Sequence, residues 1–291
     1  RRRSVRGLAS LSFSSRSPHV SAKPRMNRAT AFAPATVANV AVGFDILGFP
    51  IQAVGDKVTV ERIDSHADVE VGEVTAGTWG STQNIPKDPG KNTASVALRA
   101  MIQELKLPHG FRVSVEKGIP LGSGMGGSAA SAVGAVVAAN ATLDLPAPRE
   151  RLLAFAAIGE EAASGALHAD NIAPCLFGGL TLVLSVTPLR VVPLQLPVGI
   201  FCVLIHPHLE IETRYARSVL KAQVSLQDHV QQSARLGAFV AACYRSDRAL
   251  LKETLNDLII EPQRSHLIPG FFEAKKAALE NGALGFSISG S

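Results

Sequence analysis

The chain has 291 residues, of which 46% are hydrophobic, 18% charged and 5% aromatic, a composition typical of a globular protein with a substantial core. Residues 1–25 hold seven of the 29 basic residues and no acidic one, so the net charge of +5 hides a body with 22 basic against 24 acidic side chains. Such a body gives nucleic-acid binding no electrostatic support, and no apolar run reaches the roughly 18–20 residues that a membrane-spanning helix needs.

The arginine- and serine-rich segment 1–25 has the composition of an organellar transit peptide. We favour instead a disordered tail, or sequence ahead of a start at Met26, because ordered-looking sequence begins soon after that methionine. A cytoplasmic protein is therefore expected, and a plastid one if the segment is a genuine transit peptide. The widely spaced Cys175, Cys202 and Cys243 lie among apolar residues and predict buried free thiols in a reducing compartment.

Short runs that alternate apolar and polar residues, or that are largely apolar, predict the strands. They are expected over residues 29–33, 56–63, 67–74, 111–117, 178–186 and 199–207 and from 283 onward. Residues 67–74 are expected to pair with 56–63, and a proline-rich connector to separate 178–186 from 199–207.

Helices are expected over residues 93–106, 128–141, 148–163, 168–176, 212–222, 227–244, 247–256 and 272–281. Asn92 is the predicted cap of the first helix, and Pro148 lies in the first turn of the third. Because strands and helices mix without a regular βαβ alternation, the predicted fold class is α+β rather than a doubly wound sheet.

The stretch "GIPLGSGMGGS" (118–128) places four glycines within six positions, directly before a predicted helix start. Backbone N–H groups in such a loop bind anions, phosphate above all. The glycines fit G-x-G-x-x-G, but residues 117–121 separate them from the strand and the nearest acid, Asp144, lies in a turn, against the dinucleotide-binding pattern. A Walker A loop is excluded because no Gly-Lys-Ser/Thr follows. A glycine loop without a ligand is the other alternative.

The segment "PLGSGMGGSAAS" (120–131) resembles the phosphate loop of the GHMP small-molecule kinases. Further stretches resemble the homoserine kinases of that superfamily: "FAPATVANVAVGFDILGFPI" (32–51), "GEEAASGALHADNIAPCLFGGL" (159–180), "ETRYAR" (212–217), "IIEPQRSHLIPGF" (259–271) and "GALGFSISGS" (282–291). The chain departs from the pattern at Gly127, where serine is common. It also carries residues 1–25, which have no counterpart in bacterial members, and its last glycine-rich motif is cut short.

The resemblance implies the two-lobed α+β fold of these kinases. An N-terminal ATP-binding domain is expected over residues 26–185, with the phosphate loop opening a helix, and an incomplete C-terminal domain over residues 186–291. The implied reaction transfers the γ-phosphoryl group of ATP to the hydroxyl of L-homoserine, with Mg²⁺ as cofactor, in threonine biosynthesis. Members of this family are commonly homodimers.

The resemblance also implies roles for individual residues. Ser128 and Glu160 are expected to hold Mg²⁺ through oxygen atoms, the ligand type this ion takes. ATP-binding residues are expected at Asn92, Lys117, Pro120, Leu121, Gly122, Ser123, Gly124, Met125, Gly126, Gly127, Ser128 and Ala129.

A zwitterionic substrate needs an acid for its ammonium group and a cation for its carboxylate. By resemblance Asp45 is the acid, and Arg217 and Arg264 are the cations, since a guanidinium can bind a carboxylate through two parallel hydrogen bonds. Asn39 and His168 complete the substrate-binding set. The implied catalytic set is Asn39, Asn171, Thr213 and Arg217.

Several alternatives stay open. Asp170 is a candidate general base, although we assign it a structural role, so that catalysis rests on orientation and electrostatics. Another GHMP kinase with a different small alcohol as substrate is the nearest rival function. A non-catalytic homologue that binds a nucleotide or an amino acid is a second, and a dinucleotide-dependent oxidoreductase is a third.

Overall fold

The computed structural model describes residues 26–290 apart from positions 65, 84 and 208, so the predicted tail over 1–25 lies outside the described residues. The described strands form a six-stranded sheet. They are β1 (Arg28–Ala38), β2 (Leu47–Ile63), β3 (Val69–Ala76), β4 (Gly110–Lys117), β5 (Leu180–Val186) and β6 (Leu189–Leu194). Their order is β3-β4-β2-β5-β6, with β1 also paired with β2, and all pairs except β3–β4 are antiparallel. The predicted α+β class is confirmed.

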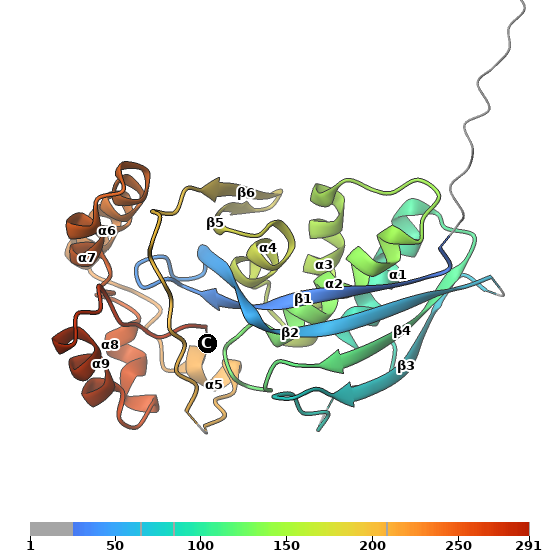
Figure 1. Ribbon diagram of the computed structural model, residues 1–291, viewed down its shortest axis with the longest axis horizontal. Helices are drawn as coiled ribbons and strands as arrows, with labels where there is room; N and C mark the ends of the chain where they lie inside the picture. Colours follow the sequence, from blue (N-terminus) through green and yellow to red (C-terminus); the bar gives the residue numbers. More distant parts are fainter. Residues whose placement is uncertain (1–25, 65, 84, 208, 291) are drawn as a thin grey trace, which may run out of the picture.

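The helices fall into two groups. Those near the sheet are α1 (Thr93–Leu105), α2 (Gly127–Ala141), α3 (Arg149–Ser164) and α4 (Ala169–Phe177). Those that follow the sheet are α5 (Thr213–Ser218), α6 (Leu226–Arg245), α7 (Arg248–Thr254), α8 (Glu261–Arg264), the 3₁₀ turn η1 (Ser265–Leu267) and α9 (Phe271–Glu280). Figure 1 shows α1, α2 and α3 along one side of the sheet and α6 to α9 gathered at the other end of the molecule. No helix in the described part of the chain is both long and apolar enough to cross a membrane.

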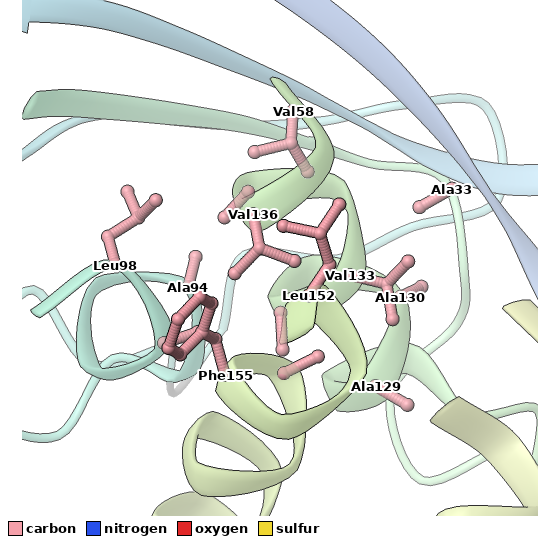
Figure 2. Close-up of a cluster of buried hydrophobic side chains, with 14 of the residues drawn as sticks. Ala33, Val58, Ala94, Leu98, Ala129, Ala130, Val133, Val136, Leu152 and Phe155 are labelled. Atoms are coloured by element: carbon pink, nitrogen blue, oxygen red, sulfur yellow. The ribbon is translucent and has the colours of Figure 1, made fainter. Parts of the chain in front are cut away.

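Helix α2 is the centre of the main hydrophobic core. Its alanine- and valine-rich sequence is buried on most sides, against β1, β2, α1 and α3. Figure 2 shows Val133 and Val136 of α2 beside Val58 of β2, with Phe155 of α3 next to them. A Cβ at Gly134 would lie 2.5 Å from a methyl carbon of Val58, so glycine at this position allows the helix to approach the sheet closely. The start of α2, where the glycine loop ends, is therefore held in place by the core.

The structure corrects several expectations about strands. β3 pairs in parallel with β4, and not with the 56–63 part of β2, because the long segment through α1 returns the chain to the same edge in the same direction. The proline-rich connector contains β6, which pairs with β5. That hairpin spans the predicted domain boundary at 185/186, and the division into two domains stays a prediction.

Residues 199–207 and 283–290 are not strands, contrary to expectation. Neither segment forms a hydrogen-bonded ladder with a described strand, and a strand-like run of residues does not make a strand without a pairing partner. Phe201 is 89% exposed and Val203 84% exposed. Cys202 is likewise exposed, whereas Cys175 and Cys243 are buried free thiols as predicted. Two smaller corrections concern helix bounds. Pro148 is the N-cap residue directly before α3 and not part of its first turn, and α5 spans 213–218 rather than 212–222.

Candidate active site

The glycine loop between β4 and α2 needs left-handed backbone at three positions. Gly122, Gly124 and Gly126 have φ of 62°, 69° and 67°. Gly126 is the N-cap of α2, and a Cβ there would lie 2.4 Å from Thr36 Oγ1 and 2.7 Å from Asn171 Oδ1. Glycine therefore serves both the turn and the close approach of backbone to side chains. The first N–H groups of α2 have no partner within the helix, and the helix dipole makes this end favourable for an anion.

A buried charged cluster ties the two ends of this loop together. Lys117 Nζ donates to Asp56 Oδ2, to the carbonyl of Gly127 at 2.8 Å and to Ser131 Oγ at 3.0 Å. Asp56 Oδ1 accepts from the backbone N–H groups of residues 118 and 119 at 3.1 and 3.3 Å, and Oδ2 from Ser131 Oγ at 2.9 Å. Asp56 is completely buried. One carboxylate thus links the end of β4 and the start of the loop with the first turn of α2.

A cleft of about 290 Å³ opens over the loop. It is lined by Ile85, Pro86, Asn92, Thr93, Val115, Lys117, residues 120–128, Ser131, Glu160, His168, Asn171, Thr213 and Gly290. Asn92 is the predicted cap of α1: its Oδ1 accepts from Ser95 N at 3.2 Å, and its Nδ2 donates to the Pro86 carbonyl at 2.9 Å. The amide of Asn92 therefore holds the wall of the cleft.

Two helices bring an acid and a histidine to the same cleft. Glu160, near the end of α3, is 3% exposed, and His168 caps the start of α4. His168 Nδ1 lies 3.1 Å from Glu160 Oε1. Ser128, in the first turn of α2, lines the same cleft. A hydroxyl and a carboxylate oxygen are ligands that Mg²⁺ takes, so the residues present fit this ion.

Helix α4 also carries Asp170 and Asn171. Thr36 Oγ1 donates to Asn171 Oδ1 at 2.6 Å, and Asn171 Nδ2 donates to Asp170 Oδ1 at 3.3 Å. Burial raises the pKa of Asp170 to about 6, and the Asp45 carboxylate adds to this effect, while His168 and Arg217 oppose it. Asn171 is thus held by hydrogen bonds to its neighbours, and it lines the cleft next to a carboxyl group whose pKa is raised.

Charged groups gather beside the cleft, where the loop after β1 meets α5. Arg217 donates to both carboxylate oxygens of Asp45, at 2.7 and 3.0 Å. Asp45 N donates to Asn39 Oδ1 at 3.1 Å, and Asn39 Nδ2 donates to the Gly290 carbonyl at 2.7 Å. Thr213 lies one helical turn before Arg217 on α5 and lines the cleft, which places this charged group at the edge of the cleft.

Arg264 is the second guanidinium of this region, and it is 2% exposed. Its Nε donates to the Ala216 carbonyl at 3.0 Å and its Nη1 to the Gly290 carbonyl at 3.1 Å. Burial lowers the pKa of Arg264, and Arg217 adds to this effect. The ring of Phe44 lies beside both guanidinium groups, with its centroid 5.1 Å from Arg264 Cζ and 5.5 Å from Arg217 Cζ.

The chain is similar to known proteins over most of its length. Residues 92–179 match the model of the GHMP kinases N-terminal domain. The chain is 50% identical to a homoserine kinase of Xylella fastidiosa, over 92% of this chain and 81% of that protein. It is 43% identical to a homoserine kinase of Chloroherpeton thalassium, over 91% of this chain and 85% of that protein.

A solved structure agrees with these relatives. The crystal structure of homoserine kinase from Cytophaga hutchinsonii matches with a TM-score of 0.85 and 41% identity, over 97% of this chain and 85% of that one. The chain belongs to the homoserine kinase family. The mevalonate kinase of L. major, with a TM-score of 0.63 and 17% identity over 92% of this chain and 86% of that one, shares the fold.

As a member of the homoserine kinase family the chain is a phosphotransferase, so the predicted family and enzyme class are confirmed. The structure brings most of the predicted site residues of this kinase into one cleft. Asn39 and Arg264 line a small adjoining pocket. Ala129 is an exception, because its side chain is fully buried in the core and only its backbone N–H could face a ligand.

Several residues that shape the homoserine kinase site were missed from the sequence. They are Thr36, Phe44, Asp56, Ser131 and Gly290. A signal for Asp56 was available: it lies at even spacing with Val58 and Val60, both fully buried, so β2 turns it towards the core. The other four form contacts between segments far apart in the chain, and no local pattern indicates them.

Proposed function

We propose that the chain transfers the γ-phosphoryl group of ATP to the side-chain hydroxyl of L-homoserine, giving O-phospho-L-homoserine in threonine biosynthesis. The observation that carries the proposal is the single cleft in which the start of α2 faces Glu160, Asn171 and Thr213, with a zwitterion's two counter-charges at its edge. Phosphoryl transfer relies mainly on positioning and on neutralising charge, and these residues supply both.

The nucleotide half of the cleft suits ATP. The N–H groups of the loop and of the first turn of α2 would bind phosphate oxygens, and the apolar Ile85, Pro86 and Val115 would cover the base. Ser128 and Glu160 would hold Mg²⁺, with His168 fixing the Glu160 carboxylate by its 3.1 Å contact. When bound, the ion would neutralise charge on the phosphate oxygens.

The other half suits homoserine. Asp45 would bind the ammonium group, and Arg217 with Arg264 the carboxylate. Asn39, Asn171 and Thr213 would orient the hydroxyl end, and His168 would border it from α4. We assign Asp170 a structural role, so orientation and electrostatics would carry the reaction.

The first test measures ADP release from Mg·ATP with L-homoserine, L-serine, L-threonine, galactose and mevalonate as acceptors. We expect turnover with L-homoserine and little with the others. Turnover with galactose or mevalonate instead would contradict the substrate assignment, and nucleotide binding without any turnover would favour a non-catalytic role.

A matched pair of variants connects that activity to the cleft. Glu160→Gln should lower kcat roughly 100-fold or more, as expected when a group that organises transition-state charge is lost. Glu161→Gln changes the next residue, which is exposed, and should leave kcat unchanged. Equal effects of the two would contradict the role of Glu160. A homodimer in the cytoplasm stays a prediction, for which light scattering of the purified chain measures the oligomeric state.

A further inference from the structure

The two charged groups assigned to opposite ends of the substrate are bonded to each other. Arg217 and Asp45 form a bidentate ion pair, with distances of 2.7 and 3.0 Å, between segments 172 residues apart. The pair is half-exposed, since 30% of the Arg217 side chain and 41% of the Asp45 side chain are accessible. Ion pairs this exposed contribute little net stability, so this one can open without weakening the fold.

The position of Asp45 does not depend on that pair. Its backbone has φ of 62°, in the left-handed region that aspartate and asparagine tolerate better than other non-glycine residues. Its N–H donates to Asn39 Oδ1 at 3.1 Å. The loop itself therefore presents the carboxylate, and Arg217, on the short helix α5, is the partner that comes to it.

The same region contains cationic donors without acceptors. Arg264 Nη2 and Arg217 Nε are buried, and neither has a hydrogen-bond partner among the described residues. Arg264 is held by the carbonyls of Ala216 and Gly290, and Phe44 lies beside both guanidinium groups. Of the two guanidinium groups, that of Arg217 is hydrogen-bonded to the Asp45 carboxylate and that of Arg264 to backbone carbonyls, so an unused donor remains on each for a second anion.

We propose that the Asp45–Arg217 ion pair occupies the place of the substrate's own charges, and that binding exchanges it for two new pairs. The substrate ammonium group takes Asp45, and the substrate carboxylate takes Arg217 and the free donor of Arg264. The inference rests on the proposed function, which it deepens by naming how the site discriminates against ligands that carry only one of the two charged groups.

The preference for a zwitterion follows from whether each ligand gives Asp45 and Arg217 a new partner. A zwitterion gives both Asp45 and Arg217 a new partner. A ligand with a carboxylate alone must displace Asp45 from Arg217 and leaves Asp45 without a cation, and a ligand with an ammonium group alone leaves Arg217 without an anion. At this half-exposed site each unpaired charge costs a small amount of free energy, on the scale of an exposed ion pair. Asp45 therefore acts against every ligand that has only the carboxylate.

Because Asp45 and the ligand carboxylate compete for Arg217, removing the Asp45 charge should change the affinities for two ligands in opposite directions. L-Homoserine and 4-hydroxybutanoate, which lacks the amino group, are titrated calorimetrically into the full chain and into Asp45→Asn, a change that keeps the left-handed backbone. The variant should bind L-homoserine roughly 30-fold more weakly, through loss of a hydrogen-bonded charge pair. It should bind 4-hydroxybutanoate about twofold to fivefold more tightly, because Arg217 is released from an exposed pair.

The matched control is Asp68→Asn. Asp68 forms a similar bidentate pair with Arg99, at 2.8 and 3.1 Å, and neither residue lines the cleft or the adjoining pocket, so its loss should change neither affinity. Arg217→Gln is the second variant should Asp45→Asn fail to fold. It should give the mirror image: weaker L-homoserine binding and tighter binding of 2-amino-1,4-butanediol, which carries the ammonium group alone.

The outcomes distinguish failure of the proposed function from failure of the ion-pair exchange alone. No binding of L-homoserine by the unaltered chain would overturn the proposed function and the exchange together. Normal binding of L-homoserine, with 4-hydroxybutanoate affinity unchanged or lowered in Asp45→Asn, would overturn the exchange alone. Opposite changes for the two ligands would support it.

Discussion

The carboxyl group of Asp170 is almost completely buried in the fold. The residue is 2% exposed, and burial, with a further contribution from Asp45, raises its pKa from 3.8 to about 6. The folded chain therefore binds this proton more tightly than the unfolded chain does. The contribution of Asp170 to the free energy of unfolding is largest below about pH 4, falls as the pH rises from about 4 to 6, and is constant above.

This pH dependence predicts a stabilising substitution. Asp170→Asn carries no charge at any pH, so relative to the unaltered chain it should gain up to about 3 kcal/mol of stability between pH 4 and pH 7, from a shift of about two pKa units. Urea unfolding at pH 4.5, 6 and 8 measures the difference. Asp68→Asn is the control: Arg99 lowers the pKa of Asp68 from 3.8, so the contribution of Asp68 changes only below about pH 4, and the difference for Asp68→Asn should stay nearly constant from pH 4.5 to 8. A pH-independent difference for Asp170→Asn would contradict the raised pKa.

The strand–loop–helix element around the phosphate loop depends on a buried ion pair. Lys117, the last residue of β4, and Asp56, on β2, have side chains 4% and 0% exposed, and neither can reach water to replace a lost partner. On the adjacent positions of the same two strands, Lys57 and Glu116 form a pair at 3.0 Å with side chains 56% and 45% exposed. The chain thus offers two cross-strand pairs, side by side, that differ in burial.

A double-mutant cycle on each pair measures what burial contributes. Lys117→Met and Asp56→Asn should each lower the free energy of unfolding by roughly 3–5 kcal/mol, because each leaves a buried charge without its partner. The double variant should lose clearly less than the sum of the two. For Lys57→Met and Glu116→Gln the coupling should be at most about 1 kcal/mol. Guanidinium unfolding measures all six variants, and additive effects at the buried pair would refute its role in anchoring the loop.

The sequence predicted elements well where local pattern and burial agree. Helices α1 and α2 and strand β4 lie within one or two residues of their predicted bounds, because a cap, a glycine start or an alternating run defines each. The segment 199–207 is a short apolar run like that of a strand but forms no ladder with a described strand, and β6 forms across a proline-containing turn that indicated a connector. Pairing partners are a property of the whole chain, which a local pattern does not contain.

The site was predictable to a similar degree. Resemblance supplied most of the residues that line the cleft, and the structure adds which of them touch. The predicted ATP contact Lys117 has its ammonium group bonded beneath the loop, and Asp45 and Arg217 contact one another. These facts depend on distances between β2, β4 and α5, and sequence spacing does not determine them.

At the scale of the molecule, the segment at Gly290 joins the phosphate loop to the charged end of the site. Its carbonyl accepts from Asn39 Nδ2 at 2.7 Å and from Arg264 Nη1 at 3.1 Å. A Cβ at this residue would lie 2.1 Å from the carbonyl oxygen of Gly124. The backbone at 290 is therefore packed between the two halves of the cleft, and Figure 1 shows this end of the chain in the middle of the molecule.

This arrangement predicts that Gly290→Ala acts on both substrates at once. The added methyl group cannot be accommodated beside Gly124, so the segment must move, and Asn39 and Arg264 lose their shared acceptor. A displacement of about 1 Å at a reacting site lowers the rate by roughly 100-fold, so kcat/KM should fall to that extent for ATP and for L-homoserine alike. Steady-state kinetics with each substrate varied in turn measures the effect.

Gly282→Ala separates crowding from backbone strain. Gly282 has φ of 91° and Gly290 has φ of 73°, so alanine is strained at both, at roughly 1–2 kcal/mol of stability. A Cβ at Gly282, however, would meet nothing within 4 Å. Gly282→Ala should therefore lower the unfolding midpoint and leave both kcat/KM values unchanged. If Gly290→Ala behaves in the same way, the segment is a strained turn and nothing more. If it raises only one KM, the contact serves one half of the cleft and does not join the two.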